Sequence, residues 1–458
     1  MRHSQKSGQT MDMLSGSLFD KLLLFAIPLA LSSILQQLFN SVDVAVVGHF
    51  AADPAVATAA VGSNGPIINL IINLFVGVSV GANVIISNYI GEGNKGKIES
   101  AVHTSMAVAI LSGFIVLVIG LAISGPVLRA MNTPESVLPY AEEYLRIYFL
   151  GMPFVMIYNF GSSVLRSIGD TKRPLICLCV SGVLNALLNM FLVIVFHLDV
   201  AGVAIATVLS NGVSAVLVIL FLVKEKNEIH LDLRRLRIAK PDLVRMLKIG
   251  VPAGLQSMVF SLSNVIIQSV LNGFGTSAVA GSAVALNYEN FSYFIIAAFN
   301  QTAVTFTSQN YGARNYERCK RVFRFCMLTS IVLTGMMSWT FILGRHFFIS
   351  IFTSDAEVAR YAAIRMVMIL SLNILSNTYE IGGAALRGIG YSMTPAILTV
   401  FGTCVFRLFW AYTICRIYHK FEVLLAVYPI SWIITGSAVL IAYFIIRRRV
   451  FSAAVLRH

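Results

Sequence analysis

Long hydrophobic stretches alternate along this chain with short segments that carry most of its charged residues. A helix of about 20 apolar residues crosses a hydrocarbon core of roughly 30 Å, and apolar stretches of that length recur from one end of the chain to the other. We therefore predict an all-α integral membrane protein with twelve transmembrane helices. The expected spans are 20–48, 56–89, 100–126, 140–165, 174–196, 200–223, 245–272, 278–309, 322–347, 358–385, 393–415 and 423–446.

The composition agrees with this reading, because 57% of the residues are hydrophobic and only 12% are charged. Soluble proteins carry about a quarter charged residues. The first apolar stretch is too long for a cleaved signal peptide and contains Pro28 and Asp43. We expect it to remain as the first membrane helix.

The net charge of +13 could indicate a nucleic-acid partner, but the positions of the basic residues favour a membrane explanation. Most Lys and Arg residues fall in alternate connections, among them the Lys224–Lys248 segment and Arg447–Arg449. Cytoplasmic loops of membrane proteins collect such residues. We therefore expect both termini to be cytoplasmic and no nucleic-acid binding.

A sequence repeat divides the chain. The motif Leu165–Gly169 returns 221 residues later as Leu386–Gly390, and the same offset pairs Gly161 with Gly382. Six spans in each half make two pseudo-symmetric six-helix bundles that begin on the same side of the membrane, with a cavity between them as the expected substrate path. The predicted domains are an N-lobe (1–224), a cytoplasmic linker (225–245) and a C-lobe (246–458).

One glycine-rich segment, Gly91–Lys97, matches GxGxxG and nearly matches a phosphate-binding loop. It follows a membrane helix instead of a strand, and Ile98 stands where a phosphate loop needs Ser or Thr. We interpret it as a tight cytoplasmic turn. No catalytic triad, metal motif or nucleotide-binding cassette is visible, so we expect no enzymatic activity and no cofactor.

Four segments of the chain form a recognisable set: Pro28 with Gln36–Asp43, Arg166–Asp170 with Pro174, Gly202–Thr207, and Ser308–Ala313. In these segments the chain resembles the multidrug and toxic compound extrusion (MATE) transporters, in their bacterial DinF- and MepA-like branch. The resemblance implies two six-helix lobes in the bacterial inner (plasma) membrane. It also implies export of organic cations or other amphipathic small molecules, driven by inward H⁺ or Na⁺. We expect a monomer whose partners are its substrate and the lipid bilayer.

Asp43 is the leading candidate for ion coupling. A carboxylate inside a membrane helix costs roughly 2.5–3.5 kcal/mol, so such acids usually face water-filled cavities and serve ions or substrates. Asn40 and Gln36 lie on the same helix face, and Pro28 is a candidate hinge because it interrupts the backbone hydrogen bonding. The alternatives are an Asp that only packs between helices and a kink that does not move.

The resemblance also points to Asn185 and Asn189 in the fifth span, which would face the same N-lobe pocket as Asp43. Some relatives carry an Asp at the second position, and this chain carries Asn189. Asp43 is therefore the clear intramembrane carboxylate of the first lobe. The lack of a paired acid weakens the case for Na⁺ without removing it, since neutral oxygens can also bind Na⁺.

Candidate residues of the second lobe are less sharply defined. Glu289 falls where the family often carries an acid, but it could instead pair with an Arg residue, and Arg146, Arg365 and Arg407 are available. Glu380 could serve the cavity or form an internal salt bridge. The remaining polar candidates for the cavity are Asn264, Gln268, Gln301, Asn377 and Tyr379, although hydrogen bonding between helices explains many such residues.

We expect a secondary active exporter that exchanges its substrate for H⁺ by alternating access. The alternatives are a Na⁺-coupled antiporter of the same family and a lipid-linked saccharide flippase of the same superfamily. A flippase should place several cationic side chains in its cavity. Only Arg146, Arg365 and Arg407 lie in the interior of the predicted spans, more than three residues from a span end.

Overall fold

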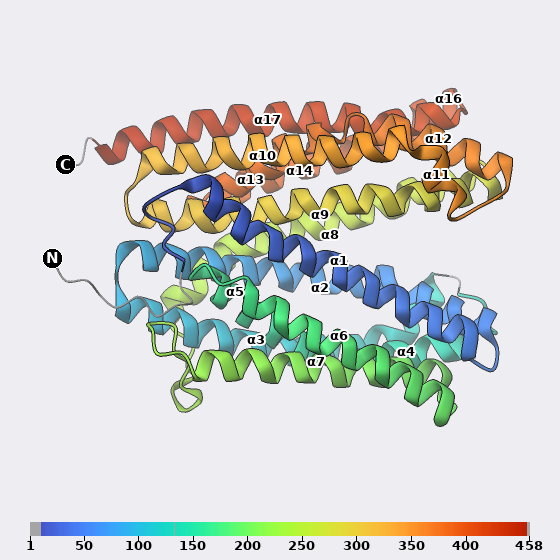
Figure 1. Cartoon of the computed structure of the whole chain (residues 1–458), viewed down its shortest axis with the longest axis horizontal. Coiled ribbons are helices and arrows are strands. Elements are labelled where there is room, and N and C mark those ends of the chain that lie inside the picture. The colour runs from blue at the N-terminus through green and yellow to red at the C-terminus, as the bar shows by residue number, and fades with distance from the viewer. Residues whose placement is uncertain (1–10, 132, 456–458) are drawn as a thin grey trace. The chain divides into compact units, whose positions relative to one another are not determined.

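The computed structural model describes residues 11–131 and 133–455, and every regular element in them is helical. Figure 1 shows their arrangement. The elements are α1 (Leu18–Phe50), α2 (Pro54–Glu92), α3 (Lys95–Ala130), α4 (Leu138–Leu150), α5 (Met152–Ser167), α6 (Lys172–Met190), η1 (Phe191–Val195), α7 (Asp199–Val223), η2 (Leu233–Arg235), α8 (Lys240–Asn272), α9 (Thr276–Gly312), α10 (Tyr316–Leu343), α11 (Arg345–Ser350), α12 (Ala356–Leu370), η3 (Asn373–Leu375), α13 (Ser376–Gly388), α14 (Met393–Thr399), η4 (Val400–Val405), α15 (Phe406–Tyr412), α16 (Ile414–Ile417) and α17 (Phe421–Val455).

The predicted fold class is confirmed, while the count of twelve membrane helices is approximate. Within the described residues, ten helices are long and apolar enough to span a membrane. The pair α4 and α5 makes an eleventh span, bent by 48° where Gly151 separates the two helices and Pro153 follows. The predicted span 278–309 corresponds to α9, which has 37 residues but a more polar sequence, with Asn, Gln, Ser and Thr along its length.

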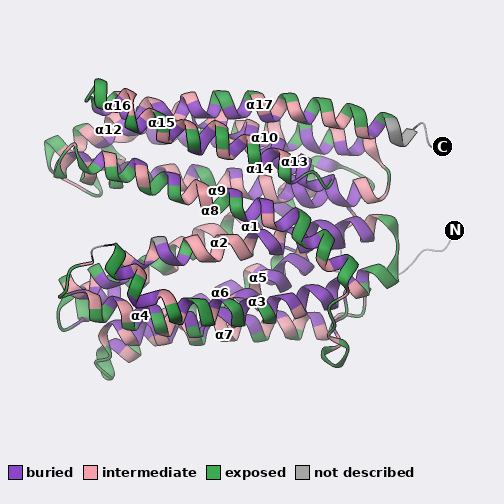
Figure 2. Cartoon of the chain, turned by 180° about the vertical axis from the view of Figure 1, so that it is seen from behind, coloured by how far each residue is buried: buried purple, intermediate pink, exposed green. Residues whose placement is uncertain are grey.

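Many helix residues are exposed, and Figure 2 shows them in green on the ribbon. Large apolar residues are among them. On α3, Leu111, Phe114, Ile115 and Val118 are all exposed, and their spacing places them on one helix face. A soluble protein rarely exposes so continuous an apolar surface. This face is suited to lipid.

The sequence repeat reappears as repeated local geometry. Gly169 and Gly390 both adopt left-handed backbone conformations, with φ of 89° and 91°, which glycine enters without steric cost. Each donates its N–H to the carbonyl three residues earlier, at 2.9 Å. Asn94 and Asn315, also 221 residues apart, cap α3 and α10 in the same way. The two halves therefore use the same turns at the same positions.

The chain divides into two compact units. The first contains Leu31–Gly254, and the second contains Met13–Ala30 together with the chain from Leu255 onward. This division differs from the domains expected from the sequence at two helices, α1 and α8. Each contributes one half to each unit, and α1 changes unit two residues after Pro28. Sequence position alone gives no sign of this exchange, because a continuous apolar helix looks the same on either side of the change.

Close glycine contacts attach the first half of α8 to the first unit. A Cβ atom added to Gly77 would lie 2.2 Å from the backbone nitrogen of Gly254, and one added to Gly81 would lie 2.3 Å from the carbonyl oxygen of Met246. On α8, a Cβ atom added to Gly250 would likewise clash with the backbone of α2. Small residues four positions apart allow membrane helices to approach this closely.

Candidate ion-coupling site

Asp43 lies in the first unit, on α1, and only 7% of it is exposed. Its carboxylate accepts a hydrogen bond from Nδ2 of Asn189 at 2.5 Å. The hydroxyl of Thr207 lies 3.5 Å from the other carboxylate oxygen. Three helices, α1, α6 and α7, therefore place polar groups around one buried acid.

The neutral members of this cluster are also bonded to one another. Asn189 donates from Nδ2 to Oδ1 of Asn185 at 3.2 Å, and Asn185 donates from Nδ2 to the hydroxyl of Thr207 at 3.3 Å. Thr207 donates to the carbonyl oxygen of Val203 one turn earlier. We call Asp43, Asn185, Asn189 and Thr207 the Asp43 cluster.

Local sequence explains how α6 reaches α1. Asn185 and Asn189 are one helical turn apart, so both side chains point to the same neighbours. One turn before Asn185, Gly182 packs directly on the ring of Phe39, and an added Cβ atom there would lie 1.8 Å from that ring. A larger residue at Gly182 would therefore have to displace either the ring of Phe39 or α6 itself.

The Asp43 cluster contains one acidic side chain, and its other three side chains are neutral. Oδ1 of Asn189 is buried and has no hydrogen-bond partner within the described part of the chain, so an acceptor oxygen beside the carboxylate is left unsatisfied. Tyr144 and Tyr148 of α4 lie within electrostatic reach of Asp43. Residues 11–131 and 133–455 place no three His, Cys, Asp or Glu side chains together to hold a metal ion. The arrangement suits a proton or a monovalent cation.

The structure changes the membership expected for this site. Asn40 and Gln36 are exposed, and neither belongs to the hydrogen-bonded Asp43 cluster. They lie on the same side of α1 as Asp43, but their side chains remain exposed while that of Asp43 is buried. Thr207 was absent from the predicted site residues, although it ends the Gly202–Thr207 segment. Its hydroxyl is a weak sequence signal, because α7 also carries Ser210, Asn211 and Ser214.

Glu289 of α9 lies in the second unit and is neutralised by Arg365 of α12. The guanidinium donates from Nε to one carboxylate oxygen at 2.7 Å and from Nη2 to the other at 2.9 Å. The neighbouring Tyr288 packs in the buried apolar cluster of this unit and donates to the carbonyl oxygen of Phe348. Of the two roles considered for Glu289, the structure places it in the ion pair.

Glu380 of α13 accepts a hydrogen bond from Nδ2 of Asn300 at 2.5 Å. It lies within electrostatic reach of Arg387 and Tyr293, but it forms no ion pair within 4 Å in the described residues. Arg387 approaches Oε1 of Gln256 at 3.5 Å. Glu380 is thus held in a polar network inside the second unit.

The remaining predicted residues of the second unit have separate surroundings. Asn377 is fully buried and accepts from Ser330, while Tyr379 is also buried. Gln301 donates to the hydroxyl of Thr305 one turn along its own helix. The exposed residues are Gln268, which donates to Asn272, and Asn264, which accepts from Arg407 at 3.1 Å.

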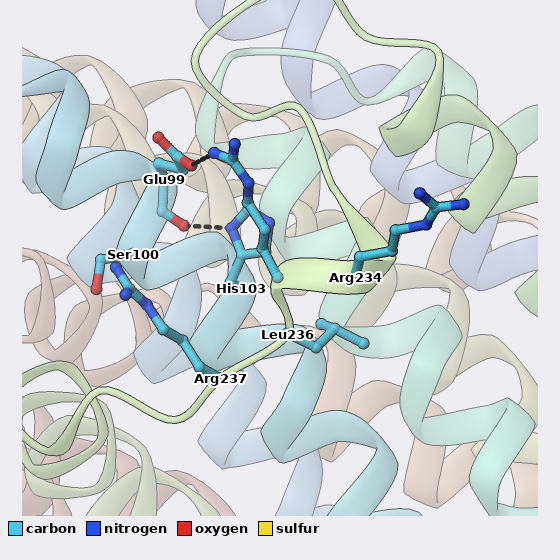
Figure 3. A pocket seen from close by; sticks show the side chains of 7 residues that line it. Glu99, Ser100, His103, Arg234, Leu236 and Arg237 are labelled. Carbon is cyan, nitrogen blue, oxygen red and sulfur yellow. Dashed lines mark hydrogen bonds and ion pairs between the residues drawn. The ribbon is translucent and has the colours of Figure 1, made fainter.

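A cavity of about 460 Å³ lies elsewhere in the first unit, between α3 and the segment before α8. Figure 3 shows its lining, with the side chains of Glu99 and His103 on α3. His103 accepts from the backbone N–H of Asp232 at Nε2, so Nδ1 carries the proton that bonds to the carbonyl oxygen of Glu99. This cavity contains none of the residues predicted for ion coupling or substrate binding. Its histidine instead fastens the connecting segment to α3.

Comparison with known proteins shows which family this chain resembles. The MatE family model matches residues 28–191 and 252–413. The probable multidrug resistance protein YoeA of Bacillus subtilis is 30% identical over 93% of this chain and 92% of its own length. The multidrug export protein MepA of Staphylococcus saprophyticus is 23% identical over 84% of each chain.

Solved structures show the same fold. One is the outward-facing conformation of a multidrug resistance MATE family transporter, which is 22% identical and covers 98% of this chain and 99% of its own, with a TM-score of 0.87. The protein has a helical membrane architecture, two family-matched segments that span most of it, and a relative 30% identical over nearly its full length. This chain therefore belongs to the MatE family of multi-pass membrane transporters.

Proposed function

We propose that this protein exports amphipathic compounds, organic cations among them, in exchange for H⁺, and that Asp43 is the coupling residue. The relatives named above as multidrug resistance and multidrug export proteins support the cargo class. The observation that carries the coupling proposal is the Asp43 cluster, in which one buried carboxylate is bonded only to amide and hydroxyl groups.

The chemistry of the cluster favours a proton. A buried carboxylate without a cationic partner is costly in its charged form, and uptake of a proton removes that cost. The protonated carboxyl group would donate a hydrogen bond, and the unsatisfied Oδ1 of Asn189 is a nearby acceptor. Loading and release of the proton would thus change the hydrogen bonding among α1, α6 and α7. Pro28 gives α1 a point where its shape can follow that change.

The driving force is sufficient for export. One positive charge that crosses 100 mV releases about 2.3 kcal/mol before any concentration gradient is added. In alternating access, external H⁺ binds Asp43, affinity for the substrate falls, and the substrate leaves outward before the lobes reorient.

Na⁺ coupling is the second candidate, and one observation favours it. The side-chain oxygens of Asp43, Asn185, Asn189 and Thr207 come together from three helices. Such an oxygen set suits a hard cation if the amide of Asn189 turns its oxygen toward the site.

Dye efflux from proteoliposomes tests the coupling. The liposomes contain the full chain and the cationic dye rhodamine 123, under an imposed pH gradient, Na⁺ gradient or neither. We expect the pH gradient to accelerate efflux in the wild type and to have no effect in Asp43→Asn. Asp53→Asn is the matched control, because Asp53 is an exposed carboxylate that caps α2, and Asn caps equally well.

Gradient-driven efflux that persists in Asp43→Asn would remove Asp43 as the coupling residue. Acceleration by the Na⁺ gradient alone would assign coupling to Na⁺.

A further inference from the structure

The repeat gives the Asp43 cluster a counterpart in the second unit. At the same offset of 221 residues, Asp43 corresponds to Asn264 and Thr207 to Tyr428, while Arg407 falls at the position of Ala186, between the two asparagines of α6. These counterparts are in contact. Asn264 of α8 and Arg407 of α15 share a hydrogen bond, and the Arg407 guanidinium lies 4.5 Å from the ring centre of Tyr428 on α17.

The charge at this second position is reversed. Where the first unit holds a buried acid among neutral groups, the second holds Arg407, of which only 1% is exposed. Its guanidinium donates to Oδ1 of Asn264 at 3.1 Å and to the hydroxyl of Ser431 at 3.3 Å. The rings of Tyr428 and Phe260 flank it. All of these partners are neutral.

No carboxylate in the described residues lies within ion-pair distance of Arg407. Glu289, on α9 of the same unit, is held in a two-point ion pair by Arg365. Arg365 also lies over the ring of Tyr428, at 5.6 Å. Two guanidinium groups therefore flank the ring of Tyr428, but the Glu289 carboxylate bonds only to Arg365. The positive charge of Arg407 is left without a carboxylate partner in the described residues. A buried charge usually has a counter-charge, because burial without one is costly.

A ligand can approach this charge from α8. Asn264 is exposed and lies on a polar stripe of the helix with Ser257, Ser261 and Gln268, at spacings that place all four on one face. Exposed apolar residues of the same helix segment, Leu255 and Leu262, lie on a different face. A polar stripe on a membrane helix is suited to water, and Asn264 is its point of contact with Arg407.

We propose that Asn264, Arg407, Tyr428 and Ser431 bind the carboxylate of an amphipathic aromatic substrate. The planar guanidinium matches a carboxylate in two-point geometry, and the flanking rings offer an apolar surface for an aromatic body. The two units would then recognise opposite charges at repeat-related positions. The inference rests on the proposed function only in taking this ligand to be cargo.

Two dyes with the same cationic ring system test the proposal. Rhodamine 110 carries a free carboxylate, and rhodamine 123 is its methyl ester. Fluorescence anisotropy with the purified full chain in detergent gives the affinity for each. We expect rhodamine 110 to bind at least about tenfold more tightly, as a charge-assisted hydrogen bond implies, and we expect Arg407→Gln to abolish the preference.

Asn264→Asp provides a second variant that keeps Arg407 in place. The new carboxylate would lie against the guanidinium and compete with the ligand, so the preference should fall toward that of Arg407→Gln. Arg360→Gln removes an exposed arginine of the same unit that stands outside this group of side chains, and it should retain the preference.

Equal affinities for the two dyes in the wild type, absence of saturable rhodamine 110 binding, or a preference that survives both Arg407→Gln and Asn264→Asp would overturn the proposal. Asp43→Asn should leave the preference intact in this equilibrium assay. Failure of ion coupling and failure of carboxylate recognition would therefore appear in different experiments.

Discussion

At the scale of single residues, the Asp43 cluster owes its chemistry to the identity of one neighbour. Asn189 holds the carboxylate at hydrogen-bond distance without adding charge, so the site has a single acid. A second acid at this position would repel the first and raise the affinity of the pair for any cation. The difference between Asn and Asp at residue 189 thus bears directly on ion selectivity.

Asn189→Asp should therefore increase the response to Na⁺. Two carboxylates with the oxygens of Asn185 and Thr207 form a set that binds a hard cation better than one carboxylate does. We expect an imposed Na⁺ gradient to accelerate rhodamine 123 efflux more in this variant than in the wild type. Asn40→Asp is the control, since it adds an acid to α1 at an exposed position outside the cluster. An equal response in both variants would contradict the assignment of Asn189 to the ion site.

At the scale of helices, buried ion pairs hold the ends of neighbouring helices together. Arg173, near the start of α6, is buried and pairs with Asp170 and, at 2.6 Å, with Glu225 after the end of α7. Oδ1 of Asp170 also accepts the backbone N–H groups of Lys172 and Arg173. This network fixes α6 against α7, the two helices that present Asn189 and Thr207.

Arg173→Ala should destabilise the protein strongly. Removal of one partner from a buried ion pair costs about 3–5 kcal/mol, because the remaining charge is left buried and unpaired. Thermal unfolding of the purified protein in detergent measures the loss. Arg235→Ala removes an exposed arginine that pairs with Glu99 at 3.3 Å, and exposed pairs contribute about 0–1 kcal/mol. Similar unfolding temperatures for the two variants would show that the Arg173 network contributes little.

At the scale of the whole molecule, each unit contains part of a helix that begins in the other. The first half of α8 belongs to the first unit, and the first half of α1 belongs to the second. Arg318 binds the segment before α1 in the second unit through the carbonyl oxygens of Met13, Ser15 and Gly16. In the first unit the glycines of α2 and α8 make the corresponding attachment.

Gly77→Leu should disrupt that attachment. An added Cβ atom at this position meets the backbone of Gly254, which cannot move aside as a side chain can, and overpacking typically costs about 1–3 kcal/mol. We expect a lower unfolding temperature and slower dye efflux. Gly62→Leu on the same helix meets nothing within 4 Å of the added Cβ and should behave like the wild type. A normal unfolding temperature for Gly77→Leu would mean that α2 and α8 do not need this close contact.

The sequence by itself determined the membrane class, the approximate spans, the two-fold repeat and the choice of Asp43 as the candidate coupling residue. These follow from local features of the sequence, namely the length of apolar stretches, the recurrence of turn residues such as Gly169 and Gly390, and the cost of a carboxylate in a membrane helix. The sequence carries no comparable signal for how each helix is rotated about its own axis, because the side that faces lipid and the side that faces the core are both apolar.

Only the tertiary structure decided which polar groups meet. It bonded Asp43 to Asn189, for which the family resemblance had implied only a shared pocket, and brought in Thr207, 164 residues away, which was not predicted. It left Asn40 exposed although it is on the same helix. It also paired Glu289 with Arg365 and left Arg407 without a carboxylate partner in the described residues. A polar side chain in a membrane helix must find its partner on another helix, and the packing of helices selects that partner.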